Sequence, residues 1–201
     1  MPEMCDNWKG VLPVPPWRRV KPVGTLGVTM LNPKKEFLLS QALLSAEIAS
    51  LQRASVYSSR ASDLDRQNLC EILRVTLVEI AGQYTKPVSE DAHIQNIVRL
   101  ANTISSKCTV SLVNGRFRFG IAQKALNLYL KYLWCLEQIP MPPHCPFDSR
   151  VMAKLPSIVQ VSWTRLDDIS AYLALVAAAK QVAAATGQSL AEWELSVYQV
   201  A

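Results

Sequence analysis

The stretch that decides the fold is Arg116–Trp134, RFRFGIAQKALNLYLKYLW, which is followed at 142–150 by PPHCPFDSR. Most of this helix-forming run is apolar, but one narrow stripe is polar, because the polar positions fall on one face at about 100° per residue. The stripe consists of Gly120, Gln123, Lys124, Asn127 and Lys131. A helix this apolar is expected to be buried, and buried cations are unfavourable unless they are paired or used in chemistry. The two lysines therefore need an explanation.

Apolar residues at helical spacing predict further helices on both sides of this run. The expected helices span 35–54, 63–84, 90–106, 120–137, 148–153 and 189–200, with a long helix before the last that begins at Thr164 or Asp167 and ends at Ala185. Around Asn114-Gly115, alternating residues predict a short β-hairpin near 109–118, or only a two-turn loop, since two strands alone are marginal. The sequence thus predicts an all-α fold, with six to seven helices in one compact domain at 34–201.

Residues 1–33 differ from the rest in composition, because they are rich in proline and carry Trp8, Trp17 and the basic cluster Arg18-Arg19-Val-Lys21. Proline favours extended backbone, so we expect a Pro-rich N-terminal arm, either wrapped on the domain or partly mobile. Two tryptophans are unfavourable in water, which argues against a fully free tail. Such an arm suits contact with a protein partner.

The bulk composition bounds the class of protein. The chain has 201 residues, of which 50% are hydrophobic and 18% are charged, so a sizeable core is expected and global disorder is not. No window of 18 or more apolar residues predicts a membrane span. The five dispersed cysteines favour free thiols in a reducing compartment, and the first residues lack the plan of a secretory signal. We therefore expect a cytoplasmic protein.

Positive charge is concentrated in two regions. The net charge is +5, and residues 1–60 and 109–155 each contribute +4, which later acidic stretches offset. This distribution permits DNA or another anionic partner, although a mildly basic surface has the same appearance. Arg116 and Arg118 alternate with Phe117 and Phe119, a pattern that suits phosphate contact with base stacking, or equally a strand with one solvated face.

Lys124 is the candidate nucleophile. An amine in apolar surroundings loses the water that stabilises its charge, so its pKa falls, and a nearby Lys131 acts in the same direction. A neutral lysine can form a Schiff base with a carbonyl carbon. The alternative is that Lys124 lies at the helix edge and extends its ammonium to water.

Asp148 is the candidate carboxylate, and it lies in a proline-rich loop. It suits proton abstraction or stabilisation of a cationic transition state, and it suits equally an N-cap for a helix beginning at Ser149. Gln123 and Asn127 suit hydrogen bonding to a base or phosphate, or to loop backbone. His144-Cys145 matches no established zinc spacing, so no metal or cofactor is expected.

The order Gly120-Ile-x-x-Lys124-Ala, an apolar helix, a proline-containing loop and Asp148-x-Arg150-Val-x-x-x-Leu resembles the signature of helix-hairpin-helix DNA glycosylases. The resemblance implies an all-helical fold that flips a damaged base, with Lys124 attacking the sugar C1′ and Asp148 assisting. It covers about 35 residues, and the family's Leu-Pro-Gly-x-Gly hairpin is replaced by Arg-Phe-Arg-Phe-Gly. The same run also resembles uncharacterised bacterial all-helical proteins, which imply no activity.

Two functions follow from the sequence. The first is a DNA base-excision enzyme of the glycosylase and lyase type, in which Gln123 or Asn127 reads the flipped base. Its expected phosphate contacts are Arg116, Arg118, Lys131 and Arg150. The second is a non-catalytic helical interaction module, in which Lys124 or Lys131 pairs with Asp148 or Glu137 and the motif is structural.

Overall fold

The helical segments are described by a computed structural model over residues 32–52, 54–156 and 162–199. The chain divides into two units, Met1–Leu31 and Asn32–Ala201, and the helices described belong to the second. The arm expected at 1–33 lies outside the described residues except for its last two positions. Of these, Asn32 caps the first helix through a hydrogen bond from Lys34 N, and Pro33 begins it.

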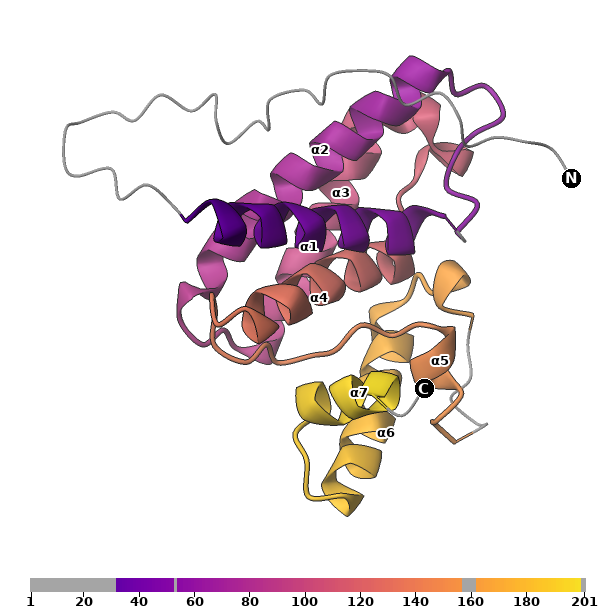
Figure 1. The fold of residues 1–201 in the computed structure, drawn as a ribbon. Helices are drawn as coiled ribbons and strands as arrows, with labels where there is room; N and C mark the ends of the chain where they lie inside the picture. Colours follow the sequence, from indigo (N-terminus) through magenta and orange to yellow (C-terminus); the bar gives the residue numbers. More distant parts are fainter. Residues whose placement is uncertain (1–31, 53, 157–161, 200–201) are drawn as a thin grey trace, which may run out of the picture. The chain divides into compact units, whose positions relative to one another are not determined.

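The all-α prediction is confirmed for the described part of the chain, which contains seven α-helices and no strand (Figure 1). They are α1 (Pro33–Leu51), α2 (Asp63–Ala81), α3 (Glu90–Lys107), α4 (Phe119–Cys135), α5 (Ser149–Met152), α6 (Ile169–Ala185) and α7 (Leu190–Gln199). Single turns of 3-10 helix form η2 (Gly82–Thr85), η3 (Thr109–Ser111), η4 (Val113–Gly115) and η6 (Trp163–Arg165).

Side-chain caps explain most helix starts. Ser89 accepts a hydrogen bond from Ala92 N, and Ser189 and Glu192 form the expected capping box of α7. The cap of α2 is Ser62, with Asp65 completing its capping box, one residue before the Asp63 that the sequence suggested. These caps satisfy amide groups that have no partner inside the helix.

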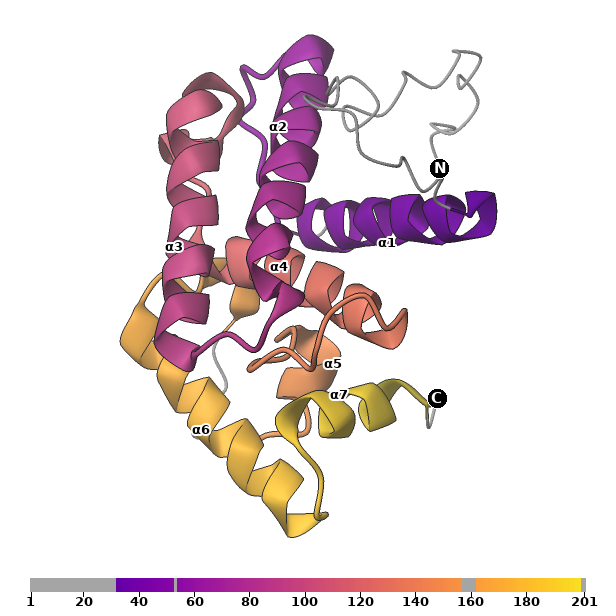
Figure 2. The ribbon, with the colours of Figure 1, turned by 90° about the vertical axis from the view of Figure 1, so that its left-hand side faces the viewer.

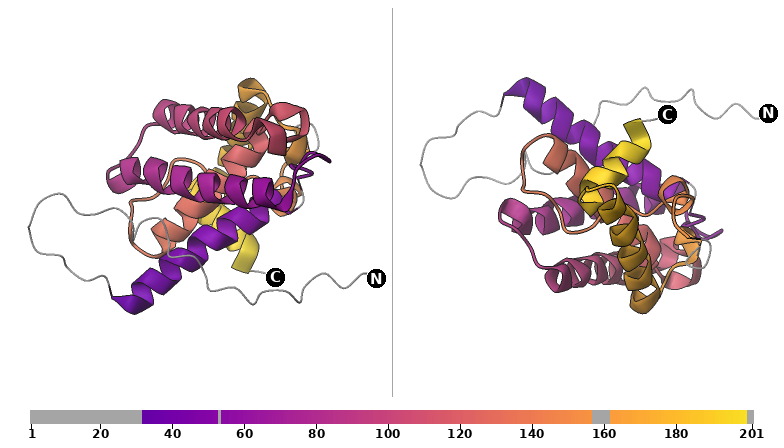
Figure 3. Two further views of the ribbon diagram at one scale, coloured as in Figure 1. Left: turned by 90° about the horizontal axis from the view of Figure 1, so that it is seen from above. Right: turned by 90° about the horizontal axis from the view of Figure 1, so that it is seen from below.

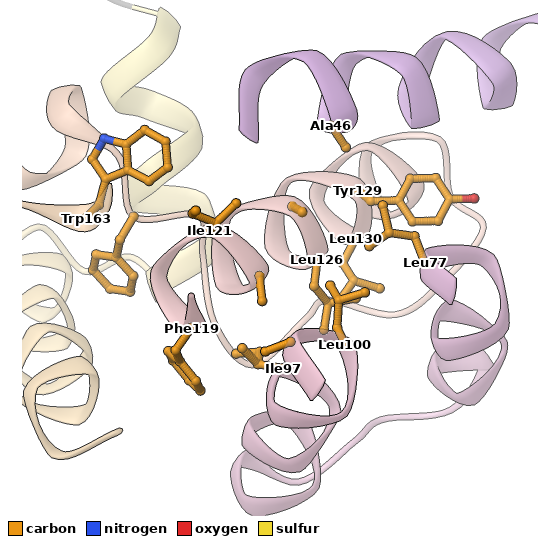
Figure 4. Packing of buried hydrophobic residues seen from close by; sticks show 14 of the residues in the cluster. Ala46, Leu77, Ile97, Leu100, Phe119, Ile121, Leu126, Tyr129, Leu130 and Trp163 are labelled. Carbon is orange, nitrogen blue, oxygen red and sulfur yellow. The ribbon is translucent and has the colours of Figure 1, made fainter. Parts of the chain in front are cut away.

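Helix α4 is the centre of the packing. It contacts α1, α2 and α3, and its N-terminal end contacts η6 (Figure 2). The close view shows Leu126 and Leu130 of α4 packed with Leu100 of α3, while Ala46 of α1 and Leu77 of α2 approach from the other sides (Figure 4). Helix α1 packs against α4 through small buried residues that include Ala42, Ala46 and Ser50. Seen from above and below, α1 crosses the bundle at an angle to α2 and α3 (Figure 3). This burial explains the apolar composition of the deciding stretch.

The predicted hairpin near 109–118 is not confirmed, because these residues form η3 and η4 instead. Asn114 and Gly115 do adopt positive φ, at 56° and 66°, but inside a 3-10 turn. Backbone groups that would pair the two strands are used elsewhere: Val113 N donates to Val56 O at 3.0 Å, and Phe117 N donates to Ser105 Oγ at 2.9 Å. A single isolated bridge joins Leu112 to Tyr57.

Within the described ranges, no single helix has the length and hydropathy to cross a membrane. Helices α6 and α7 meet that standard only when taken together, and the chain bends by 75° between them.

Candidate functional site

The polar stripe of α4 lies inside the protein. Gln123 and Asn127 have no exposed surface, and Lys124 is 6% exposed. The expectation of a buried helix with a polar seam is therefore correct. The role of each polar side chain then depends on what it contacts.

Gln123 and Asn127 bind the backbone of the loop between α4 and α5. Gln123 Nε2 donates to Phe147 O at 2.8 Å, and Phe147 N donates back to Gln123 Oε1 at 3.2 Å. Asn127 Nδ2 donates to Cys145 O at 3.0 Å. These amides therefore hold the loop that leads to Asp148, and both are covered by protein.

Lys124 and Asp148 come together, as the enzymatic hypothesis requires and the structural one allows. The Lys124 ammonium lies 3.7 Å from Asp148 Oδ2, and the two side chains are 8% and 20% exposed. Asp148 also caps α5, since its Oδ1 accepts hydrogen bonds from Arg150 N and Val151 N. Its Oδ2 accepts a further hydrogen bond from the Tyr198 hydroxyl. The loop carboxylate is thus fixed by contacts on both oxygens.

Trp163 covers Lys124. The ammonium lies 4.2 Å from the centre of the indole ring, a cation–π contact that favours the charged amine. The indole Nε1 donates to Ser149 Oγ at 3.3 Å, which ties the ring to the start of α5. Trp163 is 4% exposed, so it closes one side of the lysine site.

Gly120 makes this cover possible. A Cβ built on Gly120 would lie 1.9 Å from the carbonyl oxygen of Trp163, so only glycine fits. The close approach allows Gly120 N to donate to Leu166 O at 2.7 Å, and Phe119 N donates to Asp167 Oδ1 at 3.2 Å. The segment after Ser162 therefore satisfies the first amides of α4, which lacks a side-chain cap of its own.

Lys131 contacts the terminal helix rather than Asp148 or Glu137. Its ammonium donates to Glu194 Oε1 at 2.9 Å and lies 2.7 Å from Oε2. Glu194 is 1% exposed, and burial raises the pKa of its carboxyl while the lysine lowers it. The Tyr198 ring lies 4.4 Å from the same ammonium. Burial and the Asp148 contact raise the pKa of Tyr198.

The three arginines predicted to bind phosphate each contact a different residue of the C-terminal part of the chain. Arg116 forms an ion pair with Asp167 at 3.2 Å, and Arg118 Nη1 donates to Thr164 O at 3.0 Å. Arg150 lies over the ring of Tyr198, 4.9 Å from its centre. Each therefore has a protein contact that a bound phosphate would share or replace.

Sequence reasoning missed Glu194, Tyr198 and Trp163 as members of the site. Glu194 carried a usable signal, because it shares a helical face with Leu190, Trp193 and Val197. A carboxylate on an apolar face requires a cation, just as Lys131 requires an anion. No comparable pattern in the sequence indicated Trp163.

Two surface hollows lie away from Lys124. One, of about 280 Å³, is lined in part by Val88, Met141, Lys180 and Leu190. The other, of about 410 Å³, lies beside Trp134 and shares Met141 with the first. Neither includes Lys124 or Asp148.

Comparison of the chain with models of protein families, with curated proteins and with solved structures finds no match.

Proposed function

We propose that residues 34–201 form a non-catalytic helical interaction module, in which the Lys124–Asp148 motif organises the fold. The observation that carries this proposal is the cover over Lys124: a carboxylate at 3.7 Å on one side and the Trp163 ring at 4.2 Å on the other. Both contacts stabilise an ammonium ion. A lysine that attacks carbon needs a neutral amine and access to the substrate.

The module presents its N-terminal residues 1–33 to a protein partner. That proposal rests on their sequence, which contains Trp8, Trp17 and the Arg18-Arg19-Val-Lys21 cluster, because tryptophan and arginine are the residue types that dominate binding energy at interfaces. A shortened chain that begins at Asn32 should keep its helical spectrum and lose partner binding. Retained binding would place the interface on the helices.

The structural role of the motif is tested by Asp148→Asn, which keeps the shape of the cap and removes the charge. Breaking a largely buried ion pair here should cost about 2 kcal/mol, which lowers Tm by roughly 4–8 °C in a chain of this length. Lys124→Met should have a similar effect, whereas Lys154→Met, at an exposed position nearby, should not. Unchanged melting of both Asp148→Asn and Lys124→Met would contradict the structural role.

One observation favours a second candidate, DNA base excision: a lysine and an aspartate 24 positions apart do converge. In that reaction the neutral Lys124 amine bonds to the sugar C1′ as the bond from C1′ to the base breaks, and the departing base takes up a proton. The C1′–O4′ bond then opens, with O4′ accepting the second proton of the amine, to give an imine that borohydride reduces to a stable secondary amine. Borohydride treatment with duplexes that hold an abasic site or 8-oxoguanine tests this. An adduct that disappears in Lys124→Gln would replace the module proposal, and its absence in the wild type would end the enzymatic one.

A further inference from the structure

The chain contains two histidines, and they meet in the protein interior. His93 lies on α3, and His144 lies in the loop between α4 and α5. Both are fully buried, and their rings pack edge to face with centres 4.7 Å apart. Protonation of these two buried imidazoles is unfavourable. A charge on one ring would be desolvated, and charges on both rings would repel each other.

Each imidazole has the same kind of partner. The Tyr84 hydroxyl lies 2.7 Å from His93 Nδ1 and already accepts a hydrogen bond from Asn96 Nδ2. Since the hydroxyl accepts from the amide, its own proton is free to be donated to Nδ1. A hydroxyl that donates to Nδ1 pairs with the neutral tautomer of His93 that carries its proton on Nε2.

The second imidazole repeats this arrangement. The Tyr172 hydroxyl lies 2.8 Å from His144 Nδ1 and accepts a hydrogen bond from Asn127 Nδ2 at 3.3 Å. A proton added to Nδ1 of either ring would meet a hydroxyl that already donates there. The tyrosine would then have to turn its own proton into a buried site, so protonation breaks the existing hydrogen-bond chain.

Among the described residues, charged groups reach only one of the two rings. Glu90 Oε2 on α3 lies 3.7 Å from His144 Nε2, and Glu90 is itself paired with Lys180 of α6. The carboxylate favours a proton on His144, whereas the lysine opposes it. His93 faces His144, Tyr84 and the amide of Asn127, with no carboxylate contributing.

The pair lies where the C-terminal helices join α3 and α4. His144 sits between His93 on α3 and Tyr172 on α6, and Lys180 of α6 reaches Glu90 of α3. These polar contacts lie between α6 and the earlier helices, so a proton added to either imidazole disturbs the contacts that join them.

We propose that His93 and His144 form an acid-sensitive latch, in which proton uptake by the imidazoles releases the loop 136–147 and α6 from α3. The latch goes beyond the proposed interaction module and does not depend on it. The ligand that opens the latch is the proton.

The direction of the pH effect follows from the burial. Burial lowers the pKa of His93 to about 3 and that of His144 to about 4, from an ordinary value of 6.5. Between the lowered pKa of each folded histidine and pH 6.5, the unfolded chain therefore binds more protons than the folded chain. The free energy of unfolding falls as pH falls below 6.5. From pH 7 to pH 5 the folding equilibrium constant should fall about 25-fold per histidine. Carboxylates whose pKa is lowered, such as those of Asp65 and Asp168, affect the free energy of unfolding at lower pH than the histidines do.

Nuclear magnetic resonance of the full chain tests the titration directly, because only two imidazoles give signals. We expect neither ring to titrate above pH 5 in the folded protein. We also expect amide protection factors in α6 and the loop 136–147 to fall between pH 7 and pH 5 before those of α2. Titration near pH 6.5, or protection lost equally in all helices, would overturn the latch.

Substitutions at the half-exposed residues Lys180 and Glu90 test the direction of the pH shift without disturbing the core. Lys180→Met removes the cation that opposes a proton on His144, so the pKa of His144 in the folded chain rises towards its unfolded value and loosening should move to lower pH. Glu90→Gln removes the carboxylate that favours this proton, so the pKa of His144 in the folded chain falls further and loosening should move to higher pH. Shifts of both variants in the same direction, or no shift in either, would refute the proposed role of His144.

Discussion

Replacement of Gly120 by alanine tests the cover over Lys124 most directly. The added Cβ would lie 1.9 Å from the carbonyl oxygen of Trp163 and 2.9 Å from Leu166 Cβ. Restoring an ordinary contact of about 3.5 Å requires the backbone of this segment to move by roughly 1.5 Å. Such a movement would break the hydrogen bond from Gly120 N to Leu166 O, now 2.7 Å long.

The magnitude follows from three contributions. Overpacking costs about 1–3 kcal/mol, and the lost hydrogen bond adds about 1 kcal/mol. Removing a glycine from a helix returns about 1 kcal/mol. Gly120→Ala should therefore lower the free energy of unfolding by about 2 kcal/mol, and Tm by roughly 4–8 °C.

Gly82→Ala is the matched control, because a Cβ built there meets nothing within 4 Å and the backbone is helical. It should leave stability unchanged or raise it by about 0.5–1 kcal/mol. Thermal unfolding followed by circular dichroism separates the two variants. If Gly120→Ala melts together with Gly82→Ala, the packing of η6 on α4 is refuted, and the cover over Lys124 is refuted with it.

Two ion pairs give further predictions. Lys131→Met leaves the Glu194 carboxylate buried without its cation, so urea unfolding should show a loss of about 3 kcal/mol at pH 7. That loss should shrink at pH 5, since burial already raises the pKa of Glu194 and a protonated carboxyl is easier to bury; an equal loss at both pH values would contradict this. Arg74→Ala removes both guanidinium contacts to buried Glu47 and should lower stability by about 1–2 kcal/mol, whereas Arg60→Ala, at an exposed position, should have little effect. Equal effects of the two arginine substitutions would show that the Glu47 contact does not contribute.

Most helices were predictable because their signals are local. Ser89, Asp148 and the Ser189-Glu192 capping box mark helix starts within four residues of sequence, and Gly187 at φ 70° ends α6. Burial of α4 was equally readable, since its apolar periodicity covers most of the helix surface. These features depend on neighbours in sequence, which a single chain displays.

The partners of the polar stripe were not predictable in the same way. Lys131 and Glu194 are 63 positions apart, and nothing local relates them. The hairpin prediction failed for the same reason: Asn114-Gly115 carried the correct local signal, but Val56 and Ser105 supplied partners from elsewhere. Where distant groups compete for the same backbone atoms, local propensity does not decide the outcome.

The polar stripe then has a physical use that apolar side chains do not provide. Apolar burial is non-directional, so it would hold α4 in the core without fixing how the following segments lie against it. Hydrogen bonds and close ion pairs are directional. Gln123 fixes the loop by Phe147, Lys124 fixes the start of α5, and Lys131 fixes α7. Polar side chains at three positions along one helix thus set the position of later segments of the chain, which accounts for cations in an apolar helix without requiring a reaction.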